Sequence, residues 1–333
     1  MISAAGALEE LAGRGGPGFP NLLAARERTN ARLAELRKRV ADIEVDADAA
    51  VVLFGSWGRR ELTSQSDDDF LVLVDGRERD GVKPQPDELR RAVIGSGERE
   101  PGAHGGFGEV AFCADLSERI GLDEDLNRNL TRRMLLVLES VSVAGADAHR
   151  RCFERVLDGY LSDSLQDRHP PRFFINDLIR YWRTICVDFV GKEREGPEKW
   201  ALRNAKLRTS RKLLFASGLL PLLLCQGFRK DEIRPFLVDQ FAAPPTDRVA
   251  YAFLAAGAID PGTRALSAYD RWLAMLDDDE VRAQLQSLPR EDAKRSPVFQ
   301  EVRRLADELE AGLLALLFDT TPLRALVREY GIF

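Results

Sequence analysis

The sequence is poor in the residues that build common metal and redox sites. It has only three histidines, scattered along the chain, and four cysteines, Cys113, Cys152, Cys186 and Cys225, which form no CxxC motif. Zinc sites and disulfide frameworks require closer and more regular spacing of these residues. We therefore expect reduced thiols and a cytoplasmic protein, and we assign the histidines no role.

Long apolar runs and an excess of positive charge are also absent. The longest apolar run, Leu213 to Cys225, is interrupted by Ser217, Gly218 and Pro221, and it is too short to cross a bilayer. We expect it to form a buried helix and turn, and we expect no membrane partner. The net charge of -6 lacks the basic footprint of a bulk nucleic-acid binder. The sequence also contains no Walker-type loop, no kinase signature and no motif of a serine or cysteine nucleophile.

What the sequence does contain is an organisation in two parts. With 333 residues, two domains are the default expectation. Residue spacing predicts a helix over 21–43, short strands over 50–54, 70–74 and 109–113, a turn and short helix after the first strand, and a helix over 87–94. Helical patterns then fill most of the chain, over 125–142, 147–165, 173–191, 198–217, 263–277 and 298–317.

These patterns predict an α+β protein. Residues 1–120 would form a small mixed-sheet catalytic domain with an N-terminal helix, and residues 121–333 a mostly helical domain that binds nucleotide or acceptor. The first two strands would lie side by side and form one edge of the sheet.

One short stretch, FGSWGRRELTSQSDDDFLVL over residues 54–73, carries the chemistry. Successive side chains of a strand point to opposite faces, so Asp67 and Asp69 would lie on one side and Asp68 on the other. Two converging carboxylates repel each other unless a cation neutralises them, and Mg²⁺ prefers such oxygen ligands together with substrate phosphates. Gly55 would let backbone approach a ligand closely, and Ser56 would hydrogen-bond a phosphate oxygen.

This combination of a Gly-Ser turn, a spacer and two alternating aspartates before a hydrophobic strand resembles the signature of the polymerase-β-like nucleotidyltransferase superfamily. The wider string is similar to that of the uridylyltransferases that modify PII proteins and, more loosely, to that of bacterial cyclic-oligonucleotide synthases. The resemblance is strong over about twenty residues. In this superfamily the residue between the two acids is usually apolar, so Asp68 is a departure and would need solvent or a basic partner.

The resemblance implies a complete set of site residues. Asp67 and Asp69 would bind Mg²⁺ or Mn²⁺, and a third carboxylate on a later strand would join them. We choose Glu109 for that role, with Asp115 as its competitor. Gly55, Ser56 and Arg59 would contact the phosphates of the nucleotide.

A second basic group lies in the helical part, in the segment KWALRNAKLRTSRK. Helical spacing places Lys199, Arg203 and Lys206 on one face, from which they could reach a triphosphate. The alternative is an ordinary solvated helix face.

The predicted function is therefore metal-dependent transfer of NMP from an NTP, such as ATP, to an acceptor hydroxyl with release of pyrophosphate. The acceptor could be a protein, a tRNA or a small molecule. Two alternatives stay open. One is a synthase of a signalling oligonucleotide, and the other is a non-catalytic nucleotide-binding regulatory or antitoxin-type module. The base preference and the oligomeric state are left open by the sequence.

Overall fold

The computed structural model describes residues 3–15, 18–43, 45–77, 109–161, 165–196, 198–321 and 323–331. The helix expected over 87–94 lies outside the described residues. The chain divides into two compact units. One comprises Ala25–Asp163, and the other comprises Met1–Ala24 together with Ser164–Phe333. We call them the sheet unit and the helical unit.

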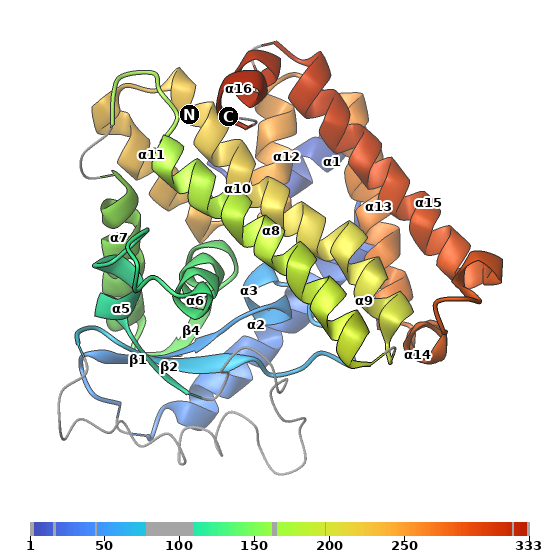
Figure 1. Ribbon diagram of the computed structural model, residues 1–333, viewed down its shortest axis with the longest axis horizontal. Coiled ribbons are helices and arrows are strands. Elements are labelled where there is room, and N and C mark those ends of the chain that lie inside the picture. The colour runs from blue at the N-terminus through green and yellow to red at the C-terminus, as the bar shows by residue number, and fades with distance from the viewer. Residues whose placement is uncertain are drawn as a thin grey trace. The chain divides into compact units, whose positions relative to one another are not determined.

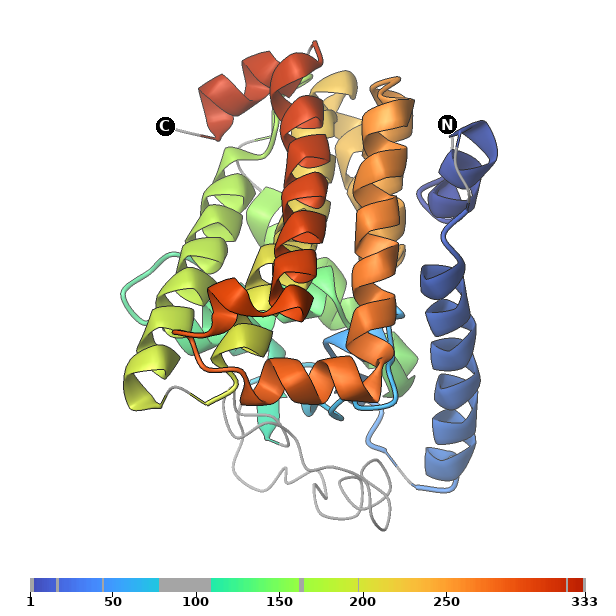
Figure 2. The same cartoon turned by 90° about the vertical axis from the view of Figure 1, so that its right-hand side faces the viewer.

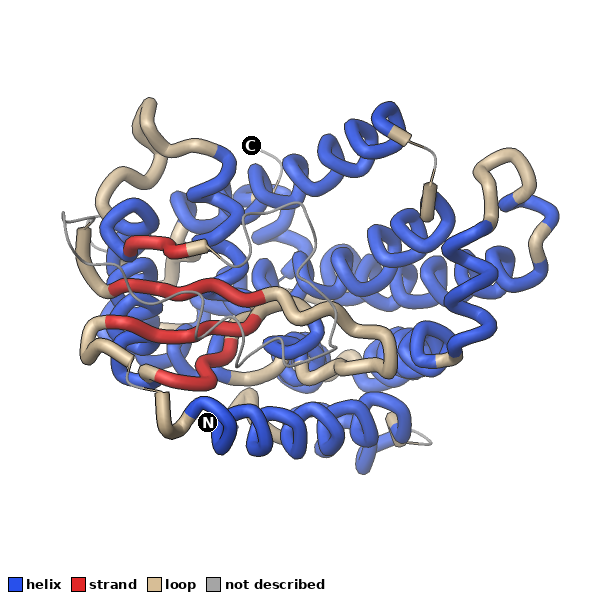
Figure 3. The backbone as a smooth tube through the Cα atoms, turned by 90° about the horizontal axis from the view of Figure 1, so that it is seen from below, coloured by secondary structure: helices blue, strands red, loops and turns tan. Residues whose placement is uncertain are grey.

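The sheet unit contains a four-stranded mixed sheet (Figure 3). Its strands are β1 (Ala49–Leu53), β2 (Phe70–Val74), β3 (Val110–Phe112) and β4 (Val141–Ala144), in the order β3-β2-β1-β4. β1 pairs antiparallel with β2 and with β4, whereas β3 runs parallel to β2. The short α3 (Ser56–Arg59) follows β1 directly.

Helices cover both faces of this sheet. On one face the buried stripe of α2 (Pro20–Val40), formed by Leu33, Leu36 and Val40, packs against a cluster that includes Val51 and Val72. This stripe has the spacing of an amphipathic helix. The alternate strand residues are also buried, because α7 (Ala146–Leu161) contacts β1 and β2 and is joined by α5 (Cys113–Ser117) and α6 (Asn127–Leu138) (Figure 1).

The described residues of the helical unit form packed helices and connecting turns, without a strand. The segment before residue 25 contributes α1 (Ala7–Gly15), which packs on α12 (Pro245–Ala255) and α13 (Ile259–Asp277). α13 also packs along α15 (Pro297–Leu314), as Figure 2 shows. The other α-helices are α8 (Arg172–Glu195), α9 (Trp200–Lys206), α10 (Lys212–Leu224), α11 (Lys230–Ala242), α14 (Asp279–Ser287) and α16 (Leu323–Tyr330), with π-helical turns at Leu207–Arg211 and Ala315–Asp319.

The structure confirms the predicted α+β class and corrects several details. β1 and β2 are neighbours, but they form the centre of the sheet rather than an edge, because β4 pairs with β1. The helix expected over 125–142 ends at Leu138, since the alternating Val141 and Val143 belong to β4. α1, α5, α11, α12, α14 and α16 were not expected. The sheet unit runs past residue 120 to Asp163, because α6, β4 and α7 pack within it.

Among the described residues, the apolar run at 213–225 forms most of α10, a buried helix that accommodates Pro221 and ends in a short 3-10 turn. No helix in the described part of the chain combines the length and the apolar character needed to cross a membrane.

Candidate active site

The Gly-Ser turn joins β1 to α3 and lies beside the third aspartate. Gly55 has φ 64° and ψ -130°, a conformation that glycine adopts without strain. A Cβ atom at this position would lie 3.6 Å from Oδ2 of Asp69. The carboxylate of Asp69 therefore lies next to the turn, and Ser56, partly exposed, follows at the start of α3.

The three aspartates precede β2 and point in different directions. The pairing of β1 with β2 extends by one residue, since the backbone N–H of Phe54 donates to the carbonyl oxygen of Asp69 over 2.9 Å. Asp67 is exposed and Asp69 is partly exposed, whereas Asp68 is buried. Asp67 and Asp69 thus share the accessible side of the segment.

The buried Asp68 has a partner that the sequence did not suggest. Its Oδ1 accepts a hydrogen bond of 2.9 Å from Nε1 of Trp57, on α3. The donor comes from the core beneath α3, because Trp57 is itself buried there. This bond ties the aspartate segment to the helix that follows the Gly-Ser turn.

Glu109 lies at the same end of the sheet as Asp69. The parallel register pairs Val72 with Val110, and the N–H of Val72 donates to the carbonyl oxygen of Glu109 over 3.1 Å. Glu109 therefore stands beside Leu71, two residues beyond Asp69, and strand alternation gives Leu71 and Asp69 the same face. Its carboxylate is half-exposed and pairs with Arg132 at 2.5 Å and Arg128 at 3.8 Å.

The competing carboxylate, Asp115, occupies a different position. β3 ends at Phe112, and Asp115 is an exposed residue of α5, beyond the opposite end of the strand. Because β2 and β3 are parallel, that end is remote from the aspartates that precede β2. Position within the sheet thus favours Glu109 over Asp115 as the candidate third carboxylate.

Arg59 is engaged by protein carboxylates. Its Nε lies 2.9 Å from Oε2 of Glu61, and its Nη1 bonds to Glu139. The guanidinium is mostly buried, and the two carboxylates together outweigh its charge. This pairing argues against the phosphate contact that the sequence predicts for Arg59, because an anion would have to compete with both partners.

The basic residues of the second predicted group belong to the helical unit. Lys199 precedes α9 with a left-handed backbone, φ 57°, and is exposed. Arg203 donates to the carbonyl oxygen of Lys192 over 3.4 Å, and Lys206 lies in the last turn of α9. The sheet unit by itself therefore holds Gly55, Ser56, Asp67, Asp69 and Glu109, and it does not supply these three cations.

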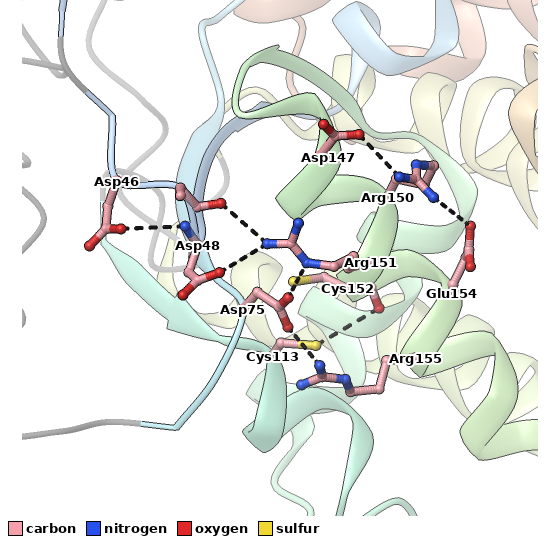
Figure 4. A network of polar contacts seen from close by, with 11 residues as sticks. Asp46, Asp48, Asp75, Cys113, Asp147, Arg150, Arg151, Cys152, Glu154 and Arg155 are labelled. Atoms are coloured by element: carbon pink, nitrogen blue, oxygen red, sulfur yellow. Dashed lines mark hydrogen bonds and ion pairs between the residues drawn. The ribbon is translucent and has the colours of Figure 1, made fainter.

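A further polar cluster lies at the other end of β2 (Figure 4). The ligand atoms of Asp75, Cys113 and Cys152 all lie within 4.8 Å of one another. Asp75 is also paired with Arg151 at 2.6 Å and Arg155 at 2.9 Å, so its charge is already balanced and the site disfavours a cation. Sequence spacing gave no signal for this cluster, since only the packing of α7 brings Cys152 to Cys113 at the start of α5.

Comparison with known families agrees with the motif. Residues 33–129 match the family model described as a nucleotidyltransferase domain. The match covers the Gly-Ser turn, the three aspartates and Glu109, and it is consistent with the polymerase-β-like superfamily that the motif resembles. A search among curated proteins found no match to the chain.

Proposed function

We propose that the nucleotidyltransferase domain of residues 33–129 transfers NMP from an NTP, such as ATP, to an acceptor hydroxyl. One observation carries the proposal. Asp67 and Asp69 share an accessible side of the chain beside the Gly55–Ser56 turn, while Asp68 is turned into the core. Two carboxylates next to a close-approach glycine are suited to a metal-bound nucleotide.

The donor type suits a hard divalent cation. Asp67, Asp69 and Glu109 offer carboxylate oxygens at one end of β2 and β3, and Mg²⁺ or Mn²⁺ prefers oxygen ligands. When bound, such an ion neutralises phosphate charge and supports in-line displacement at phosphorus. The ion pair with Arg132 would position the Glu109 carboxylate at the edge of this set.

Each residue then has a role in the transfer. Gly55 and Ser56 would hold the β- and γ-phosphates, through close backbone approach and the serine hydroxyl. The acceptor oxygen bonds to the α-phosphorus, the bond from that phosphorus to the oxygen bridging to the β-phosphate breaks, and pyrophosphate leaves. Glu109 would accept the hydroxyl proton, which requires hydrogen-bond reach of the acceptor.

The acceptor is proposed to be a protein, a tRNA or a small molecule in the cytoplasm. For Lys199, Arg203 and Lys206 of the helical unit, contact with a triphosphate stays a prediction from the sequence. A second candidate is a nucleotide-binding module without transfer. The pairing of Glu109 with two arginines favours it, because a base held by cations accepts a proton less readily.

The test measures release of labelled pyrophosphate from four γ-labelled NTPs with Mg²⁺ or Mn²⁺, with and without cell extract. We expect Asp67→Asn and Asp69→Asn to lower the rate of pyrophosphate release by more than roughly 100-fold. A loss of up to that size is typical when a residue that only supports a metal ligand is replaced. Glu109→Gln should lower it as well, whereas Asp115→Asn, a matched control at the other end of β3, should leave it unchanged. If no NTP releases pyrophosphate and the variants bind NTP like the wild type, the non-catalytic module is the better description.

A further inference from the structure

Arg60 has a guanidinium that lies partly buried in the sheet unit without a carboxylate partner for its Nη1 among the described residues. It directly follows α3, and its Nη1 is buried without a hydrogen-bond partner among the described residues. Buried guanidinium N–H groups are nearly always paired, because burial removes their water.

The charges that act on Arg60 have the same sign as its own. They come from Arg37 and Arg26 of α2, and together with burial, the larger cause, they lower the pKa of Arg60 to about 10. Arg26 and Arg37 are 11 residues apart, about three helical turns, so they lie on one side of α2. All three guanidiniums carry a positive charge at neutral pH.

The backbone at Arg60 adds a second cost. Arg60 has φ 61° and ψ 41°, the left-handed conformation that favours glycine. The turn is nevertheless well fixed, since the N–H of Arg60 donates to the carbonyl oxygen of Trp57 over 3.2 Å. A strained residue that presents an unpaired, buried charge is typical of a binding position rather than of a structural one.

Neighbouring arginines show what a structural role requires. Arg59 pairs with Glu61 and Glu139, and Arg133, which is fully buried, pairs with Asp125 at 2.8 Å. The sheet unit therefore has carboxylates for its structural arginines, and the described part of the chain provides none within hydrogen-bond reach of Nη1 of Arg60.

The contacts of Arg37 and of α3 place this cluster toward β4. Arg37 donates to the carbonyl oxygen of Ser142 on β4 over 3.0 Å, and Gly58 of α3 lies against the backbone of Glu139, two residues before β4. β4 is the outer strand next to β1, so β1 stands between it and β2 in the sheet. The arginine cluster belongs to the β4 edge, and Asp67 and Asp69 precede β2.

We propose that Arg60, with Arg26 and Arg37, binds a phosphate group of a small phosphorylated molecule at the β4 edge of the sheet unit. A phosphate offers the oxygens that the unpaired guanidinium lacks, and its negative charge offsets the mutual repulsion of the three arginines. The chain's net charge of -6 favours a small anion over a long nucleic acid. The site does not depend on the proposed transfer reaction.

The test is the affinity for tripolyphosphate, measured by calorimetry on the full chain in EDTA, so that the metal-binding aspartates do not contribute. Arg60→Gly keeps the left-handed turn and removes the charge. We expect it to weaken binding at least 10-fold and to raise the melting temperature without anion. Arg168→Gly is the matched control, because Arg168 is an exposed arginine with φ 60° in the helical unit.

Two further arms distinguish the possible sources of the signal. Ser56→Ala removes the hydroxyl that is proposed to hold the β- and γ-phosphates at the transfer site, so it should not lower tripolyphosphate affinity, and a fall like that of Arg60→Gly would place the anion at the Gly-Ser turn instead. Equal affinity of wild type and Arg60→Gly, no binding by wild type at millimolar anion, or binding of single-stranded RNA but not of tripolyphosphate would each overturn the proposal.

Discussion

At the scale of single residues, three consecutive aspartates occupy different environments. Asp67 and Asp69 lie on the accessible side, and Asp68 is buried against Trp57. Alternation of side chains along an extended segment is sufficient to separate them. A local rule thus assigns the accessible pair, but the role of Asp68 depends on a neighbour eleven residues away.

The bond from Trp57 to Asp68 should contribute to stability. Trp57→Phe keeps the buried ring but removes the N–H donor, so we expect the free energy of unfolding to fall by about 1–3 kcal/mol. Urea denaturation measures it. Trp200→Phe is the matched control, because the Nε1 of Trp200 is buried with no partner in the described structure. Equal losses in the two variants would show that the bond contributes nothing.

His149 should make the stability depend on pH. Burial lowers the pKa of His149 from 6.5 to about 4, and its Nε2 lies 2.8 Å from Oγ of Ser140. The unfolded chain gains a proton near pH 6.5 and the folded chain only near pH 4. The free energy of unfolding is therefore highest above pH 6.5 and falls as the pH drops from 6.5 to about 4. Since the ring is partly exposed, we expect a loss of about 2 kcal/mol.

The measurement is urea denaturation between pH 7 and pH 4, for wild type and His149→Gln. The variant lacks the titrating group, so its stability should fall less over the same window. Parallel curves for the two proteins would contradict a low pKa at this residue.

At the scale of elements, α3 is the part that connects the Gly-Ser turn to the rest of the sheet unit. A Cβ atom on Gly58 would lie 1.9 Å from the carbonyl oxygen of Glu139, which is backbone and cannot move aside alone. The close approach of α3 to the segment before β4 therefore requires glycine. The sequence shows this glycine but not the strand end that it meets.

Gly58→Ala should displace α3 and with it the turn that carries Ser56. We expect the unfolding free energy to fall by about 1–3 kcal/mol, as in other overpacked sites. Metal-dependent NTP affinity should also fall, which calorimetry can measure. Gly191→Ala in α8 is the control, because open space surrounds Gly191, and there alanine should stabilise the helix by up to about 1 kcal/mol. Unchanged NTP affinity in Gly58→Ala would separate α3 from nucleotide binding.

The predictable elements were those with a complete local pattern. The stripe of α2 and the short apolar runs of β1, β2 and β3 were anticipated, because helical and strand spacing can be read within a few residues. β4 was missed, since only Val141 and Val143 carry its alternation, directly after an apolar helix. These residues form a strand because they pair with β1.

At the scale of the whole molecule, the N-terminal segment belongs to the helical unit together with residues from 164 onward. The N–H of Ala4 donates to Asp239 over 3.0 Å, and the N–H of Leu22 donates to Oδ1 of Asp270 over 2.8 Å. The same Asp270 accepts a hydrogen bond of 2.6 Å from the side chain of Asn21. The chain thus enters the helical unit, leaves it to form the sheet unit, and returns.

Asp270 should therefore fix the N-terminal segment. Asp270→Ala removes a buried acceptor from two donors, and we expect the unfolding free energy to fall by about 1–3 kcal/mol. Limited proteolysis should also cut sooner near residue 21. Asp307→Ala, at an exposed position of α15, is the control and should change stability by less than about 0.5 kcal/mol. If both variants behave like wild type, the N-terminal segment is held by other contacts.

The sequence by itself determined the α+β class, the strands of the motif and the alternation that leaves Asp67 and Asp69 accessible, because spacing and turn chemistry act over a few residues. Only the tertiary structure decided which strand flanks β1, that Trp57 donates to Asp68, that Glu109 precedes β3 on the side of the aspartates while Asp115 lies beyond its other end, and that Cys113 lies beside Cys152. These contacts join distant residues, and burial, strand pairing and charge balance select them together.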